Sequence, residues 1–156
     1  MTQIFAAILA LISKKQFDRA GSLIDTARNS LDASQMHRLT ALSAVLEDSR
    51  GNTSAAIDLI RRAIREDPTW LPHWHRLADY LIEVERWLEA VEALDELISL
   101  SERNDDVYFL DDARVRKAIC LKALGRNAEI EALKREIRPD TEVYLGGRIY
   151  TVKDLG

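Results

Sequence analysis

The chain has 156 residues, enough for one domain whose hydrophobic core needs neither disulfides nor a structural metal. Its 22 Lys and Arg residues against 26 Asp and Glu residues give a formal net charge of −4. The sequence has no long basic run, which argues against nucleic acid or an anionic membrane surface as the main partner. The one cysteine, Cys120, lies in an apolar helical run and is predicted to be a buried, reduced thiol.

The first predicted element is the apolar segment IFAAILALI, residues 4 to 12. It has the composition of a signal-peptide core, but no positive residue precedes it, and Lys14 and Lys15 follow it. The segment is also shorter than a helix that spans a bilayer. We therefore predict a buried first helix in a cytoplasmic protein.

A pattern of apolar and small residues, spaced by three, four and three positions, recurs along the chain about every 35 residues. Residues at these spacings lie on one face of a helix, and alanine allows a neighbouring helix to approach closely. An amphipathic segment precedes each copy, at 3–13, 36–48 and 71–83. The pattern therefore predicts a row of antiparallel helix pairs. Its copies are Phe17, Ala20, Ile24 and Ala27; Thr53, Ala56, Ile60 and Ala63; and Trp87, Ala90, Leu94 and Leu97.

These residues resemble the tetratricopeptide repeat (TPR) family. The third unit carries the pattern best, with Trp74, Leu77 and Ala78 in its first helix and Trp87 and Ala90 in its second. The resemblance implies an all-α, helix-turn-helix repeat solenoid of three to four repeats and about eight helices, in a single domain. The expected repeats are about 2–30, 36–67, 71–101 and 107–138, the last one weaker and preceded by a longer linker at 101–106.

The chain then ends in a predicted β-hairpin at 142–151, because the two glycines of VYLGGRIYT permit a two-residue turn with positive φ. Such a turn pairs Leu145 with Arg148, Tyr144 with Ile149 and Val143 with Tyr150. A lone hairpin is marginal in water, so we expect its apolar residues to pack on the last helices as a cap. The alternative is a recognition element whose free edge adds a partner's strand.

The TPR resemblance also implies where a partner would bind, since the first helix of each pair lines the concave surface. The positions expected in this groove are Phe5, Leu9, Ile12, Arg38, Asp48, His75, Asp79, Glu83, Asp112 and Lys122. The groove would be apolar toward the first repeat and acidic in the middle. Two alternatives stay open for the three apolar residues of the first helix: an exposed patch that binds a partner or a second copy of the chain, or core.

Catalytic, cofactor and metal sites are not predicted. His73 and His75 are two residues apart and would point to different sides of a helix, and His37 has no partner in the sequence. No phosphate-binding glycine loop, Cys-His cluster or nucleophile turn occurs. We therefore expect no enzyme and no cofactor.

The predicted function is a non-catalytic interaction scaffold or adaptor that binds another protein or peptide with a basic surface. The paired Lys and Asn residues with which some TPR proteins hold a carboxylate terminus are absent from the groove positions. The alternative is an immunity protein that blocks a cognate bacterial toxin, because YFLDDAR and the terminal GGRIYT resemble small helical-repeat proteins of that kind. An acidic surface suits the cover of a basic active site.

Overall fold

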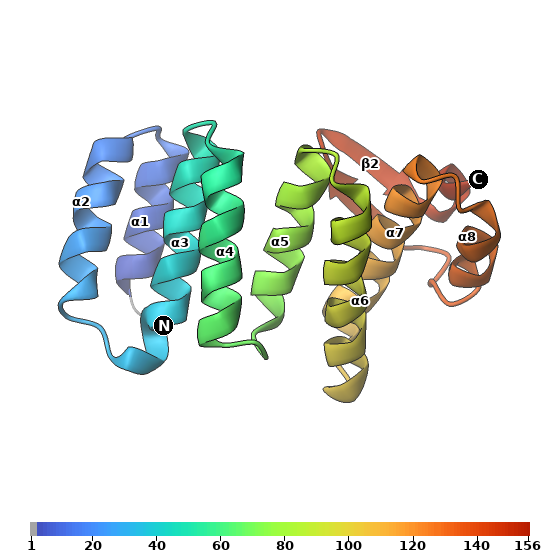
Figure 1. The fold of residues 1–156 in the computed structure, drawn as a ribbon, viewed down its shortest axis with the longest axis horizontal. Coiled ribbons are helices and arrows are strands. Elements are labelled where there is room, and N and C mark those ends of the chain that lie inside the picture. Colours follow the sequence, from blue (N-terminus) through green and yellow to red (C-terminus); the bar gives the residue numbers. More distant parts are fainter. Residues whose placement is uncertain (1–2) are drawn as a thin grey trace. The chain divides into compact units, whose positions relative to one another are not determined.

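The computed structural model describes residues 3–156, which form eight α-helices and one two-stranded antiparallel sheet (Figure 1). This confirms the predicted all-α repeat fold with a C-terminal hairpin. The contacts divide the chain into two compact units, an N-terminal unit that ends at His73 and a C-terminal unit from Trp74 to Gly156. The boundary falls inside the fifth helix.

The helices follow one another in pairs, as the repeats predict. They are α1 (Gln3–Ser13), α2 (Phe17–Arg28), α3 (Met36–Ser49), α4 (Thr53–Glu66), α5 (Leu71–Glu83), α6 (Trp87–Arg103), α7 (Val107–Ala123) and α8 (Asn127–Lys134). A short 3-10 helix, η1 (Ala33–Gln35), precedes α3. The sheet consists of β1 (Glu142–Leu145) and β2 (Arg148–Thr151), and a 3-10 helix, η2 (Val152–Leu155), ends the chain.

The small residues of the repeat pattern are buried in both units. Ala20, Ala56 and Ala90 have no exposed surface. In the N-terminal unit α1 packs against α2 and α3, and α3 packs against α2 and α4. In the C-terminal unit α7 packs against α6 and α8. The buried alanines therefore do what the repeat pattern predicted: they allow neighbouring helices to come close.

Two helix ends differ from the predicted repeat bounds. Helix α6 continues to Arg103, so the first half of the expected linker at 101–106 is helical. Asn104 to Asp106 then make the connection, with Asp105 at a positive φ of 53°. Helix α8 ends at Lys134, and the buried Ile137 lies in the turn that follows.

The thiol of Cys120 is buried in α7, as predicted. Burial raises its pKa to about 12, because an apolar environment disfavours the thiolate. The charge of Arg116 acts in the opposite direction but does not offset the burial. Cys120 is therefore a protonated, packed side chain at neutral pH.

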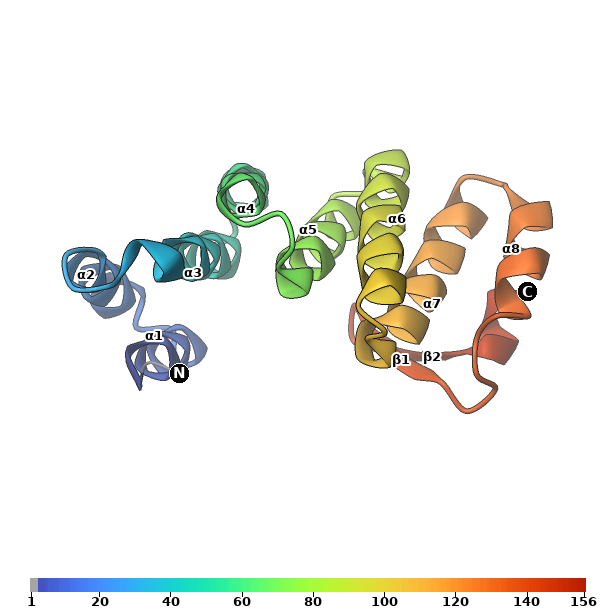
Figure 2. The ribbon, with the colours of Figure 1, turned by 90° about the horizontal axis from the view of Figure 1, so that it is seen from below.

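The hairpin has the predicted register, with Leu145 opposite Arg148 and Val143 opposite Tyr150. Val143 is buried where β1 packs on α7, and η2 adds the buried Leu155 against α7 and α8. Figure 2 shows β1 and β2 beside α7. We expected all five apolar residues of the hairpin to be buried, but Tyr144 and Ile149 are exposed. They lie opposite each other on the second face of the sheet, where both side chains are exposed.

Candidate functional site

A buried arginine organises the inner part of the C-terminal unit. Arg116 lies on α7 between the buried Val115 and Ala118 and is only 5% exposed. Its guanidinium donates to Asp79 on α5, to Asp112 one turn earlier on α7 at 2.6 Å, and to the backbone oxygen of Tyr144 on β1 at 3.2 Å. One side chain therefore joins two helices and the hairpin through charge-assisted hydrogen bonds.

His75 completes this Arg116 cluster, which we define as His75, Asp79, Asp112 and Arg116. The Nε2 atom of His75 lies 2.9 Å from Asp112 Oδ1, and its Nδ1 atom lies 3.9 Å from Asp79 Oδ2. The two carboxylates thus share one arginine and one histidine. This arrangement differs from the free, solvated charges that an acidic groove implies.

Burial pulls the pKa values of the two carboxylates upward, but only one of them ends above its ordinary value. Burial raises the pKa of Asp79, and the charge of Arg116 offsets this only in part. For Asp112, burial also acts upward, but the hydrogen bond to His75 and the charge of Arg116 outweigh it and lower the pKa. Asp112 is therefore the more firmly ionised partner of Arg116.

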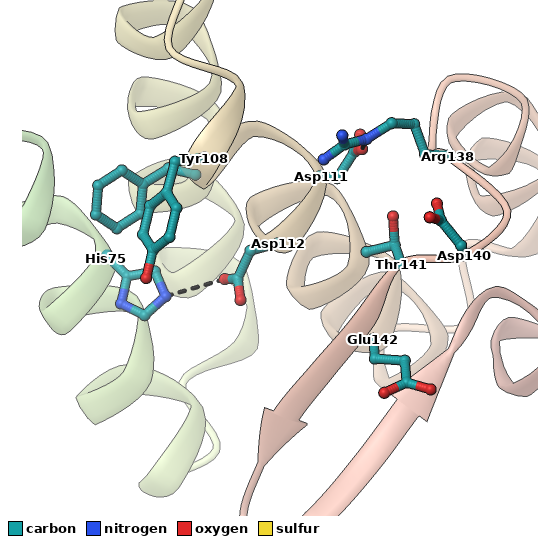
Figure 3. Close-up of a pocket in the computed structure, with 9 residues that line it drawn as sticks. His75, Tyr108, Asp111, Asp112, Arg138, Asp140, Thr141 and Glu142 are labelled. Atoms are coloured by element: carbon teal, nitrogen blue, oxygen red, sulfur yellow. Dashed lines mark hydrogen bonds and ion pairs between the residues drawn. The ribbon is translucent and has the colours of Figure 1, made fainter.

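A pocket of about 410 Å³ lies beside the cluster (Figure 3). Its walls come from α5, from the first turns of α7, and from the segment that leads from α8 into β1. The lining residues are His75, Tyr108, Phe109, Asp111, Asp112, Arg138, Asp140, Thr141 and Glu142. The pocket is therefore both aromatic and acidic.

The aromatic wall begins at the first turn of α7. Asp106 caps this helix by accepting from the backbone N–H of Tyr108 at 3.0 Å. Tyr108 is 80% exposed, and its ring meets that of Phe109 edge to face at 4.9 Å between centroids. The ring of Phe109 lies 5.4 Å from that of His75. The exposed ring of Tyr108 therefore contacts Phe109, and Phe109 in turn contacts His75.

The acidic wall holds more carboxylates than it needs for its own ion pairs. Asp111 is buried and accepts from Arg138 Nε at 2.5 Å. Within residues 3–156, Asp140 and Glu142 make no ion pair. Four carboxylates line the pocket, but Arg138 is the one arginine or lysine among its lining residues. The pocket therefore has an excess of negative charge.

The structure brings together three of the predicted groove residues, namely His75, Asp79 and Asp112. Glu83 ends α5 and Lys122 lies in the last turn of α7; both are exposed, and neither lines the pocket. Arg116, Tyr108 and Glu142 also belong to the cluster or the pocket, although no sequence pattern indicated them.

In the N-terminal unit, Phe5 and Ile12 are core residues, and Leu9 is 42% exposed. The alternative of one exposed patch of all three is therefore wrong, because the side of α1 that carries Phe5 and Ile12 packs into its own unit. Arg38 lies over the ring of Phe5 at 4.6 Å, and Asp48 accepts from the Thr53 hydroxyl at 2.9 Å. A homodimer through this helix stays a prediction.

His37 has a partner that the sequence analysis did not find. Its Nδ1 atom lies 2.8 Å from Nε2 of His73, and both rings are buried in the N-terminal unit. The two histidines are 36 positions apart. Two contacts of the Arg116 cluster have almost the same separation: Asp79 to Arg116 and His75 to Asp112 are each 37 positions apart. The missed signal was therefore a separation close to one repeat, which brings residues of successive first helices near each other.

Metal-binding clusters and membrane-spanning helices are both absent from the part of the chain that the structure describes. Among residues 3–156, no group of three or more His, Cys, Asp or Glu side chains could hold a metal ion. No helix in the same range is long and apolar enough to cross a membrane.

Comparison with known proteins gives the fold. No protein-family model and no curated protein matches the chain. Among solved structures, the chain is similar to the nearly identical TPR-like repeats of a candidate kinesin light chain from Podosopora anserina, with a TM-score of 0.69 and 14% identity over 86% of this chain and 73% of that one. A single-substitution variant of the same protein gives the same values. The chain therefore has a TPR-like helical repeat fold.

Proposed function

We propose that the chain is a non-catalytic interaction scaffold that binds a positively charged segment of a partner protein at the pocket of the C-terminal unit. The observation that carries this proposal is the surplus of carboxylates beside an exposed tyrosine. Interfaces are enriched in tyrosine, and a charged rim attracts and orients a partner of opposite charge. The TPR-like fold supports the proposal, because repeats of this type present extended surfaces to other macromolecules.

The contacting carboxylates in this proposal are Asp140 and Glu142 rather than Asp79 and Asp112. The latter two already pair with Arg116 and so maintain the wall of the pocket. Asp140 and Glu142 are exposed, and a cation brought to them needs to break no internal ion pair. The site thus lies closer to the hairpin than the groove positions implied.

The same surface suits a dedicated inhibitor, such as an immunity protein that covers a toxin's basic active site. The two roles differ in the number of partners: an inhibitor has one tight partner, whereas an adaptor has several weaker ones. We place either role in the cytoplasm, where a single reduced cysteine is usual.

Affinity purification with the full chain as bait tests the proposal. Asp140→Arg with Glu142→Arg should lose the captured partners, which mass spectrometry identifies. The matched control is Glu92→Arg with Glu96→Arg, which makes the same charge change at two exposed positions of α6 outside the pocket. Partners that survive the first variant, or that both variants lose equally, would contradict the proposed site.

A further inference from the structure

The pocket of the C-terminal unit has the chemistry of a site for one particular side chain. We infer that it takes the guanidinium group of an arginine that the partner supplies. This inference rests on the proposed function and narrows it from a basic surface to a single residue type.

The two walls of the pocket fit the two properties of a guanidinium. Its flat face stacks on aromatic rings, and Tyr108 offers an exposed ring beside Phe109. Its edge carries N–H donors in a fixed fork, and Asp140 and Glu142 are carboxylate acceptors on the opposite side (Figure 3). A lysine ammonium would meet the carboxylates as a point charge but would gain less from the rings.

The arginine that already lines the pocket does not pair with Asp140 or Glu142. Arg138 lines the pocket, but its side chain is directed to Asp111, whose carboxylate lies 2.5 Å away. The hydrogen bond to Asp111, together with the charges of Asp111 and Asp140, raises the pKa of Arg138. Arg138 thus pairs with Asp111, and the carboxylates of Asp140 and Glu142 are the ones that can meet a second cation.

Other parts of the chain use the same chemistry internally. Arg38 lies over the ring of Phe5, and Arg148 lies over the ring of Tyr150, each at 4.6 Å from the ring centroid. Arg116 shows the pairing with carboxylates, since its guanidinium donates to both Asp79 and Asp112. The pocket brings both kinds of group, aromatic rings and carboxylates, to the walls of one cavity. Its volume of about 410 Å³ lies in the range of small-ligand sites.

Titration of the full chain with N-acetyl-L-arginine N-methylamide, followed by ¹H–¹⁵N NMR, tests the inference. Saturable shifts should appear at residues 108–109 and 140–142. N-acetyl-L-lysine N-methylamide should bind at least about fivefold more weakly, because it cannot stack or form a fork. Asp140→Asn with Glu142→Gln should abolish the shifts, and Glu92→Gln with Glu96→Gln should leave them unchanged.

A second pair of variants tests the aromatic wall without risk to the fold. Tyr108→Ala should weaken arginine binding severalfold, whereas Tyr144→Ala, which removes another exposed tyrosine outside the pocket lining, should not. Equal binding of the lysine and arginine derivatives, or no saturable shift at the pocket, would overturn the inference. If the partners of the affinity experiment still depend on Asp140 and Glu142 in that case, the proposed function stands and only the choice of arginine fails.

Discussion

At the scale of single residues, Arg116 joins α5, α7 and the hairpin of the C-terminal unit. Arg116→Met should lower the free energy of unfolding by about 3 kcal/mol, because two partly buried carboxylates lose their shared cation. Urea unfolding followed by circular dichroism measures the change. Arg116→Lys should recover only part of the loss, since an ammonium cannot replace the fork of the guanidinium.

The matched control is Arg126→Met, which removes an arginine from the exposed pair with Glu129. This variant should unfold like the parent protein, because exposed ion pairs contribute little to stability. A loss as large as that of Arg116→Met would show that the position of the arginine in the cluster is not what matters.

The two carboxylates of the cluster should respond to pH in opposite directions. The lowered pKa of Asp112 means that its ionised form stabilises the fold above its ordinary value of 3.8, and that this stability is lost as the pH falls through the lower folded value. The raised pKa of Asp79 means that its contribution is present below 3.8 and is lost as the pH rises through the folded value.

Unfolding free energies of the parent protein, Asp112→Asn and Asp79→Asn, measured from about pH 3 to about pH 7, test this. The advantage of the parent over Asp112→Asn should grow with rising pH, whereas its advantage over Asp79→Asn should shrink. Two differences that change in the same direction would contradict the opposite shifts of the two pKa values.

Sequence reasoning found three members of the cluster but not the contacts between them. His75, Asp79 and Asp112 were predicted as groove residues from the TPR resemblance, which implies that the first helix of each pair lines the concave surface. Their common partner was missed because Arg116 stands between Arg114 and Lys117 in a strongly charged segment, where nothing local indicates burial. Tyr108 is largely exposed, and a single exposed tyrosine has no local sequence pattern that marks a site. The contacts of the cluster could have been sought among residues of successive first helices that are about one repeat apart.

At the scale of elements, the hairpin offers a direct comparison of its two faces. Val143→Ala should lower the free energy of unfolding by about 2 kcal/mol, since Val143 is almost completely buried on α7. Ile149→Ala removes more side-chain atoms at an exposed position and should change stability far less. Thermal melts of the two variants decide whether the hairpin stabilises the unit. A larger loss for Ile149→Ala would contradict the assignment of the faces.

The elements themselves were largely predictable, because their signals are local. Gly146 and Gly147 determined the turn and therefore the register of the hairpin. The end of α6 was less predictable, since SERNDD has a polar composition that suits a linker as well as a helix end. Ser101 is buried in the structure, so packing extended the helix beyond the predicted limit.

At the scale of the whole molecule, the net charge of −4 should steer a basic partner over a distance. The association rate with the partner should fall about tenfold between roughly 50 mM and 300 mM salt, because ions screen the attraction. Stopped-flow measurements test this. Glu92→Arg with Glu96→Arg should slow association through the net charge while leaving the dissociation rate unchanged. A dissociation rate that rises in this control would place the contact on α6.

The repeat architecture was predictable from the sequence because the spacing of alanines recurs through three units, and Ala20, Ala56 and Ala90 are all fully buried. The pocket was not predictable in the same way. It needs the start of α7 and the entry to β1 to lie side by side, and Tyr108 and Glu142 are separated by a whole helix pair. A local sequence pattern cannot relate two residues that are so far apart along the chain.

Because the chain has a single cysteine, the packing of Cys120 makes α7 its own reporter of local opening. With a pKa of about 12 and no exposed surface, the thiol cannot react with an alkylating reagent until the helix exposes it. The rate of alkylation at neutral pH therefore reports how often the C-terminal unit opens locally, and no engineered label is needed. A partner that binds at the start of α7 would slow the alkylation of Cys120, because it would make local opening of the helix rarer.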